Sequence, residues 1–154
     1  MDVAARRVFD GVLTVENGVV SSIAPSSDVD ADAPYFLPGF IDSHVHIESS
    51  MMVPAEFARV AVEQGTIGVV ADPHEIGNVL GKEGIEFMIE SGKNIRFNFC
   101  FGAPSCVPSC SADIETSGAA LGSNDVDELL ARDDIGYLAE MMNFVGTING
   151  DPQV

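Results

Sequence analysis

The stretch FIDSHVHIESS, residues 40–50, decides the fold class that this chain is expected to adopt. It opens with a short, mostly apolar run that predicts a strand over residues 40–45, and it continues into a polar loop. Side chains two residues apart on a strand point to the same side, so His44 and His46 face one way while Val45 points into the packing. Two imidazoles about 7 Å apart at a strand end can converge on one ion. The sequence therefore predicts that His44 and His46 are metal ligands.

The same pattern of strand, loop and helix recurs along the rest of the chain. The predicted elements are a helix from Pro54 that stops at Gly65, a strand over 66–71, a helix over 81–92, a strand over 95–101, a helix over 125–134 capped by Asn124 or Asp125, and a strand over 135–141. Four strands alternating with three helices imply a parallel sheet with right-handed crossovers. We therefore expect an α/β fold, a partial β/α barrel of four βα units. A doubly wound sheet stays open, because it also places ligands at the carboxyl ends of its strands.

A small β-rich segment is expected ahead of this sheet. Asn17-Gly18 lies between two β-rich runs, and both residues tolerate the positive φ of a tight hairpin turn. Residues 26–34, SSDVDADAP, form a polar connector. The sequence thus predicts two parts, residues 1–37 and 38–154, with the chemistry in the second.

The composition excludes several partners. There are 24 acidic and 7 basic residues, a net charge of −17, and such a surface repels nucleic acid and anionic membranes. A high salt concentration inside the cell would also explain this acidic surface, because salt screens the repulsion between its charges. No apolar run reaches the roughly 18 residues that a membrane span needs, and no secretory signal follows the N-terminus. Three cysteines without CxxC spacing suit a reducing compartment, so a cytoplasmic location is expected.

Polar residues also follow the second predicted strand. Asp72, His74 and Glu75 lie just after it, where a carboxylate and an imidazole can shuttle protons, so we predict a catalytic role for the three. In the alternative interpretation, Asp72 caps the turn and His74 is structural.

His74-Glu75 does not begin the HExxH motif of a metalloprotease. The fifth position is Asn78 instead of histidine. Pro73 and Gly77 are also expected to prevent a helix there.

Further candidates follow the third and fourth strands. Ser105 and Cys106 are predicted to line a substrate pocket, although a loop held by prolines explains them almost as well, and no base is in view to activate the Cys106 thiol. Glu140 interrupts the otherwise apolar run YLAEMMN, which favours a ligand over a surface acid or a helix cap.

Several motifs together resemble a known family. LPGFIDSHVHIESS resembles the first-strand signature of the amidohydrolase superfamily. SSMMVPAEFA, GVVADPHEIGNVLG, GAPSCVPS and LAEMMNF follow in the order found in the adenine deaminase family. The resemblance runs from about Arg7 to the last residue and implies a barrel of the amidohydrolase type.

The resemblance implies the hydrolytic deamination of adenine to hypoxanthine and ammonia at a divalent, two-metal site of manganese or iron, with zinc also suited. His44 and His46 would hold one ion, and Glu140 matches the position of the bridging carboxylate. The other residues would act on the purine: Asp72, His74 and Glu75 in catalysis, and Ser105 and Cys106 in substrate binding.

The resemblance also implies that the site is incomplete. A full barrel has eight strands in about 250 residues, and no histidine follows His74 to supply the family's later ligands. Val145 also stands where NFPG would have proline. We expect an N-terminal portion that lacks appreciable deaminase activity alone. Its exposed strand edges favour self-association or a homo-oligomer.

Two other functions stay open. Relatives of dihydroorotase and hydantoinase usually bridge their metals with a carbamylated lysine on the fourth strand, where this chain has Glu140 instead. A truncated homologue could also serve as a non-catalytic metal-binding or interaction module.

Overall fold

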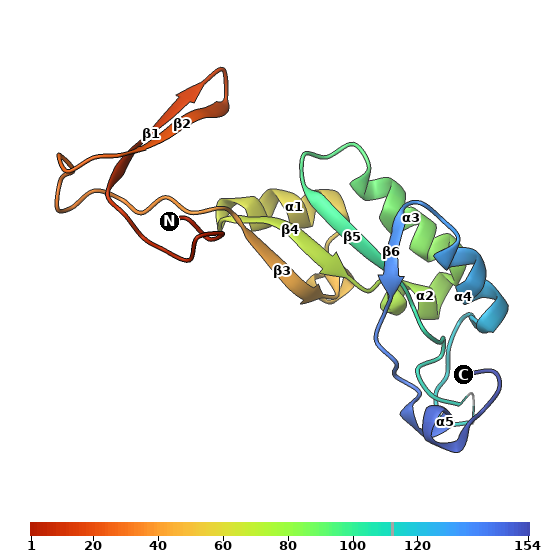
Figure 1. Ribbon diagram of the computed structural model, residues 1–154. Helices are drawn as coiled ribbons and strands as arrows, with labels where there is room; N and C mark the ends of the chain where they lie inside the picture. The colour runs from red at the N-terminus through yellow and green to blue at the C-terminus, as the bar shows by residue number, and fades with distance from the viewer. Residues whose placement is uncertain (112) are drawn as a thin grey trace. The chain divides into compact units, whose positions relative to one another are not determined.

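A computed structural model describes residues 1–111 and 113–154 (Figure 1). They divide into two compact units, Met1–Gly39 and Phe40–Val154. In the first unit, strand β1 (Gly11–Glu16) pairs antiparallel with β2 (Val19–Pro25). Asn17 and Gly18 turn the hairpin with φ of 53° and 77°, the left-handed conformation that the sequence predicts.

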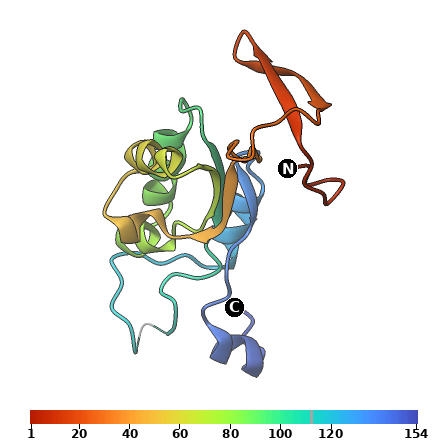
Figure 2. The ribbon, with the colours of Figure 1, turned by 90° about the vertical axis from the view of Figure 1, so that its left-hand side faces the viewer.

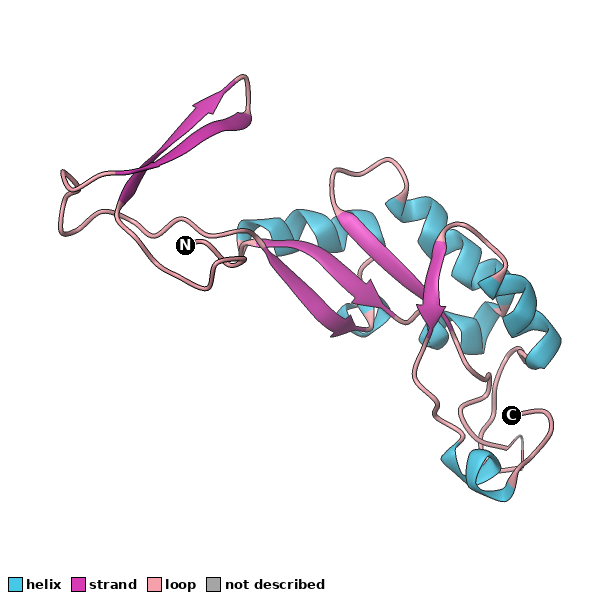
Figure 3. Cartoon of the chain, in the orientation of Figure 1, coloured by secondary structure: helices cyan, strands magenta, loops and turns pink. Residues whose placement is uncertain are grey.

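The second unit contains a parallel sheet of four strands (Figure 3). They are β3 (Phe40–Val45), β4 (Thr66–Ala71), β5 (Asn98–Ala103) and β6 (Ile135–Leu138), and each lies beside the next one in the chain. A doubly wound sheet reverses its strand order at a switch point, and the order β3-β4-β5-β6 has no reversal. The α/β class is confirmed, and successive strands bring their carboxyl ends to one edge.

Helices connect the strands. The long connections contain α1 (Pro54–Glu63), α3 (Lys82–Gly92) and α4 (Ser123–Leu130), and shorter pieces are the 3₁₀ turn η1 (Ile47–Ser50), α2 (His74–Leu80) and α5 (Phe144–Asn149). Helices α1 and α3 lie together on one side of the sheet (Figure 2). The core lies between that face and the helices, and its most buried residues include Val69, Phe101, Ile85 and Leu129. No helix in residues 1–111 and 113–154 combines the length and apolarity that crossing a membrane requires.

Two predicted strands have different ends in the structure. Strand β5 begins at Asn98, not at residue 95. Its register with β4 starts at Gly68↔Asn98, and just before it the N–H of Phe97 donates to the carbonyl of Ile95 instead of to β4. Strand β6 ends at Leu138, not at residue 141. Ala139 still donates its N–H to the carbonyl of Ala103, which is the last residue of β5, so the ladder between the two strands ends there.

The prediction that Pro73 and Gly77 prevent a helix is wrong. Helix α2 begins at His74, directly after Pro73, where a proline costs nothing because the first N–H groups of a helix lack intrahelical partners. Gly77 lies inside α2, where glycine costs only about 1 kcal/mol relative to alanine. The HExxH interpretation still fails, because Asn78 occupies the fifth position.

The predicted cap of the third helix is also corrected. Helix α4 starts at Ser123, and its N-cap is Gly122 instead of Asn124 or Asp125. The Asp125 carboxylate accepts the backbone N–H of Gly122 at 3.0 Å, so it closes the first turn from inside the helix. Helix α5 has no counterpart among the predicted elements.

Candidate metal centre

Four side chains converge at the edge where the parallel strands end. His46 follows β3, Asp72 follows β4, His74 begins α2, and Glu140 lies two residues beyond β6. One possible ligand atom from each lies within 4.8 Å of those from the other three. Imidazole nitrogens and carboxylate oxygens are ligands for manganese, iron and zinc alike, so the four residues form a candidate divalent metal centre.

The three predicted metal ligands lie close together. The Nε2 atoms of His44 and His46 are 3.1 Å apart. The Glu140 carboxylate lies 3.8 Å from the Nε2 of His44 and 3.4 Å from that of His46. His44 is the outer member, with 57% of its side chain exposed against 21% for His46. An approach by Glu140 to both rings is the arrangement that a carboxylate shared between two ions would need.

A backbone carbonyl orients the inner histidine. The Nδ1 of His46 lies 3.0 Å from the carbonyl oxygen of Asp72. A carbonyl only accepts hydrogen bonds, so Nδ1 carries the proton and donates it. The lone pair of Nε2 is thereby free, and it faces His44 and Glu140. Metal-binding histidines are usually held by such a bond at the second ring nitrogen.

The carboxylate of Asp72 fits a cation. Asp72 is only 2% exposed, and its Oδ2 accepts the Nδ1–H of His74 at 3.2 Å. Its Oδ1 is buried without a hydrogen-bond partner among the described residues. A buried polar atom without a partner is costly, and a divalent ion would satisfy it. The pKa of His74 is raised, because its imidazolium form donates to the neighbouring Asp72 carboxylate.

Asp72 does not cap the helix that follows it. Helix α2 has Pro73 as its N-cap and no capping bond from that residue's side chain. The three residues predicted to act in catalysis, Asp72, His74 and Glu75, do not all lie together. The first two belong to the metal cluster, whereas Glu75 accepts a hydrogen bond from the Ser49 hydroxyl and lies outside it.

The predicted substrate-binding pair has structural contacts. Ser105 donates its hydroxyl to the backbone carbonyl of Glu140 at 2.5 Å, which joins the loop after β5 to the end of β6. Cys106 is buried, with its Sγ 3.9 Å from the carbonyl of Ser109. Ser105 is therefore hydrogen-bonded to the backbone of Glu140, which is a candidate metal ligand.

A cavity of about 220 Å³ opens beside the candidate centre. Its wall includes His44, Asp72 and Glu140, together with Val70 of β4 and Tyr137 of β6. Burial raises the pKa of Tyr137 to about 12, so its hydroxyl stays protonated at neutral pH. The cavity gives a small polar molecule a route to the metal-facing side chains.

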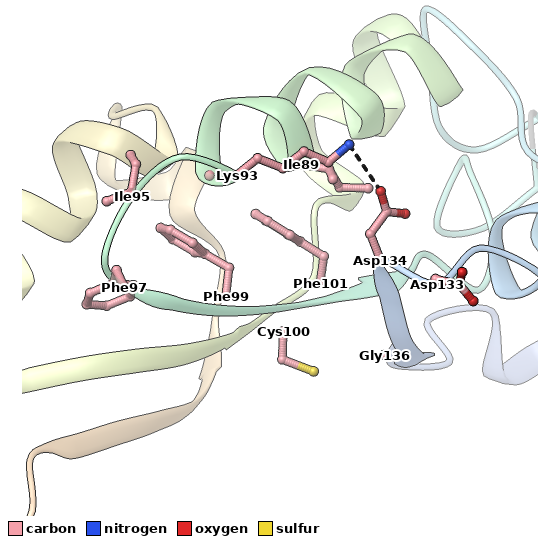
Figure 4. Close-up of a pocket in the computed structure, with 11 residues that line it drawn as sticks. Ile89, Lys93, Ile95, Phe97, Phe99, Cys100, Phe101, Asp133, Asp134 and Gly136 are labelled. Atoms are coloured by element: carbon pink, nitrogen blue, oxygen red, sulfur yellow. Dashed lines mark ion pairs between the residues drawn. The ribbon is translucent and has the colours of Figure 1, made fainter.

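A larger hollow of about 350 Å³ lies away from the centre, beside α3 and β5 (Figure 4). Phe99 and Phe101 point from β5 toward Ile89 on α3, while Cys100 points to the opposite side of the strand (Figure 4). The ion pair between Lys93 and Asp134, at 3.4 Å, lies at its rim. No member of the metal cluster lines this hollow, so it is not part of the candidate site.

Sequence reasoning missed Glu48. Its half-buried carboxylate accepts the backbone N–H of Ile76 at 3.2 Å, and burial raises its pKa. The one available signal was an acid two residues beyond His46. Alternation along a strand could not place it, because β3 ends at Val45 and η1 begins at Ile47.

Comparisons with known proteins identify the family and several relatives of this chain. The sequence profile of the amidohydrolase family matches residues 35–153. The chain is 52% identical over 154 residues to an adenine deaminase of Salinibacter ruber. It is 53% identical over 154 residues to one of Methanosarcina mazei and 48% identical over 154 residues to one of Parabacteroides distasonis.

Each alignment covers 100% of this chain but only 27% or 28% of the relative. The chain thus spans little more than a quarter of the length of these relatives.

Proposed function

The chain belongs to the amidohydrolase family, and we propose that its second unit supplies metal-binding residues for the hydrolytic deamination of adenine to hypoxanthine and ammonia. The cluster of His46, Asp72, His74 and Glu140 carries this proposal. It brings together four possible ligands, and one of them, Asp72, has a buried carboxylate oxygen without a hydrogen-bond partner among the described residues. The substrate follows from the three relatives named adenine deaminase. In this proposal the sheet is the first half of a β/α barrel.

The proposed ligands are those of the sequence prediction, with two additions. His44, His46 and Glu140 hold the metal, and the four-residue cluster adds Asp72 and His74 as donors. We propose manganese or iron in a binuclear centre, with zinc also suited to these ligands. When bound, such ions supply the Lewis acidity that activates water at neutral pH.

In this proposal the chain's own residues orient the metal ligands and transfer protons. The bond from His46 Nδ1 to the Asp72 carbonyl keeps Nε2 available as a donor. The reaction needs protons on the purine ring and on the departing amine. We assign these transfers to Glu75, which follows the proposed ligand His74 at the start of α2. The Ser49 hydroxyl donates a hydrogen bond to the Glu75 carboxylate and holds it in place.

Glu140 favours this activity over the dihydroorotase and hydantoinase alternative. In place of a lysine, a carboxylate lies 3.4 Å from His46 at the end of the fourth strand of the sheet. We further propose that the 154 residues alone do not turn adenine over. Their histidines are limited to three, and the residues expected on later strands are needed for catalysis. Self-association through the outer strands β3 and β6 belongs to the same proposal.

Metal binding by the chain tests the proposal. Mn²⁺ suits nitrogen and oxygen donors, so the three thiols compete for it poorly. We expect His46→Ala and Asp72→Asn to weaken Mn²⁺ binding strongly, measured from the spin-resonance signal of the free ion. Asp133→Asn is the matched control, because Asp133 is an exposed acid outside the cluster. Equal Mn²⁺ affinity in all four proteins would contradict the proposed centre.

A supplied remainder of the enzyme separates catalysis from a non-catalytic role. The chain is mixed with the C-terminal part of a related adenine deaminase, and the conversion of adenine to hypoxanthine is followed by absorbance. Activity in the mixture that Asp72→Asn abolishes would support the deaminase, whereas metal binding without activity would favour the non-catalytic module.

A further inference from the structure

Helix α2 begins without a capping side chain of its own. The first N–H groups of a helix lack intrahelical partners and are usually bonded by the side chain at the N-cap. The N-cap of α2 is Pro73, whose side chain has no acceptor. The backbone N–H of Ile76, the third residue of α2, donates instead to the Oε1 of Glu48 at 3.2 Å. The cap of this helix thus comes from a residue 28 positions earlier in the chain.

Glu48 lies on η1, the turn that directly follows His46. Ile47, the first residue of η1, is fully buried and anchors the turn in the core. Ser49, which follows Glu48 in the turn, donates its hydroxyl to the carboxylate of Glu75 on α2. Two adjacent residues of η1 are therefore bonded to the first turn of α2.

These two bonds act on the metal centre because each segment begins at a candidate ligand. His46 is the last residue before η1, and His74 is the first residue of α2. Their imidazole centroids are 4.7 Å apart. The orientation in which α2 packs against η1 therefore decides how His74 meets His46 and Asp72.

We propose that Glu48 is a positioning residue for the metal centre, and that its carboxylate oxygen caps α2 so that His74 stays aligned with His46. This inference rests on the proposed function, since it takes both histidines as ligands. The bond to Ile76 requires an acceptor oxygen at the right reach, and it does not require a negative charge. Residues that orient ligands in this way typically change metal affinity 10–100-fold when they are replaced.

Two substitutions of Glu48 separate the effect of side-chain length from the effect of charge. Glu48→Gln keeps an acceptor oxygen at the same distance from the backbone and removes the charge. Glu48→Asp keeps the charge and withdraws the oxygens by one methylene. Glu83→Asp, at an exposed glutamate in the first turn of α3, is the control for shortening a glutamate elsewhere.

Two measurements on the full chain report the result. The first is Mn²⁺ affinity, followed by the spin-resonance signal of the free ion. The second is the hydrogen exchange rate of the Ile76 amide in the metal-free protein, followed by NMR. We expect Glu48→Asp to weaken Mn²⁺ binding by about 10-fold or more and to speed exchange at Ile76. Glu48→Gln and Glu83→Asp should stay close to the original protein in both.

Three outcomes would overturn the inference. They are unchanged Ile76 exchange in Glu48→Asp, faster exchange without weaker Mn²⁺ binding, and loss of Mn²⁺ binding in Glu48→Gln but not in Glu48→Asp, which would show an effect of charge. If the unsubstituted chain binds no Mn²⁺, the proposed metal function fails and the positioning role falls with it. The Ile76 exchange rates would then still show whether Glu48 caps α2.

Discussion

The imidazole of His74 donates from Nδ1 to the Oδ2 of Asp72 at 3.2 Å, while the Oδ1 of the same carboxylate is buried with no partner among the described residues. The carboxylate is therefore oriented on one side and unsatisfied on the other. One oxygen of this carboxylate lies within 4.8 Å of possible ligand atoms from His46, His74 and Glu140. This combination is the strongest structural argument for a cation at the strand ends.

Metal binding should stabilise the folded chain. A ligand that binds only the folded state at 100 times its Kd adds about 2.7 kcal/mol to the free energy of unfolding. Thermal unfolding with and without Mn²⁺ measures this, and we expect a higher Tm with the ion and a return to the lower value with chelator. Asp72→Asn should show no such gain. An equal gain in that variant would place the bound ion elsewhere.

Tyr137 should ionise near pH 12, because burial raises its pKa to about 12. Absorbance of the phenolate against pH measures this. The chain has 2 tyrosines, so Tyr35→Phe isolates the signal of Tyr137. A midpoint near 10, the usual value for tyrosine, would contradict the burial of this ring.

The same pKa shift predicts how stability depends on pH. Between about pH 10 and pH 12 the folded state retains a proton that the unfolded state has released. The free energy of unfolding should therefore fall as pH rises through this window, and the contribution of Tyr137 is fully present below it. Denaturant unfolding at several pH values checks the sign, and Tyr137→Phe should show a smaller fall.

Gly102→Ala should destabilise the sheet beside the cavity. A Cβ at Gly102 would lie 2.6 Å from the Cζ of Tyr137, and a rigid ring cannot move aside as a flexible side chain would. We expect a loss of about 1–3 kcal/mol in the free energy of unfolding, measured with denaturant. The same substitution made together with Tyr137→Ala should cost less. Gly77→Ala is the control, because a Cβ there would meet its nearest atom at 3.5 Å, an ordinary contact, and alanine is well tolerated inside a helix.

The metal-loaded chain alone should give no appreciable conversion of adenine to hypoxanthine. The chain contains three histidines, His44, His46 and His74, and all of them lie at or just after the first two strands of the sheet, β3 and β4. Absorbance of adenine over time, with Asp72→Asn as the blank, measures the rate. A rate typical of enzymes, on the order of 1–10³ per second, would show that these residues suffice.

Local sequence determined several elements closely. The strands over 40–45 and 66–71 have the predicted bounds, and α1 begins at Pro54 as expected. The turn at Asn17-Gly18 follows from two residues that tolerate positive φ. These features depend on neighbours along the chain, so composition and periodicity are sufficient to predict them.

Other features depended on which segments meet. Periodicity placed His44 and His46 on one side of a strand, but only the order and register of β3, β4 and β6 bring Asp72 and Glu140 to them. Strand β5 begins at Asn98, where its hydrogen-bonded register with β4 starts. A strand needs a neighbour to satisfy its backbone, so its ends are properties of the sheet.

Helix α2 and its cap show the same division. Proline and glycine argue against a helix when only adjacent residues are considered, yet an acceptor from Glu48 satisfies the first turn across 28 positions of sequence. The sequence by itself determined the residue types of the candidate metal site and the side of the strand on which the first two lie. The tertiary structure alone decided which carboxylates join them, because ligand geometry depends on contacts between distant segments.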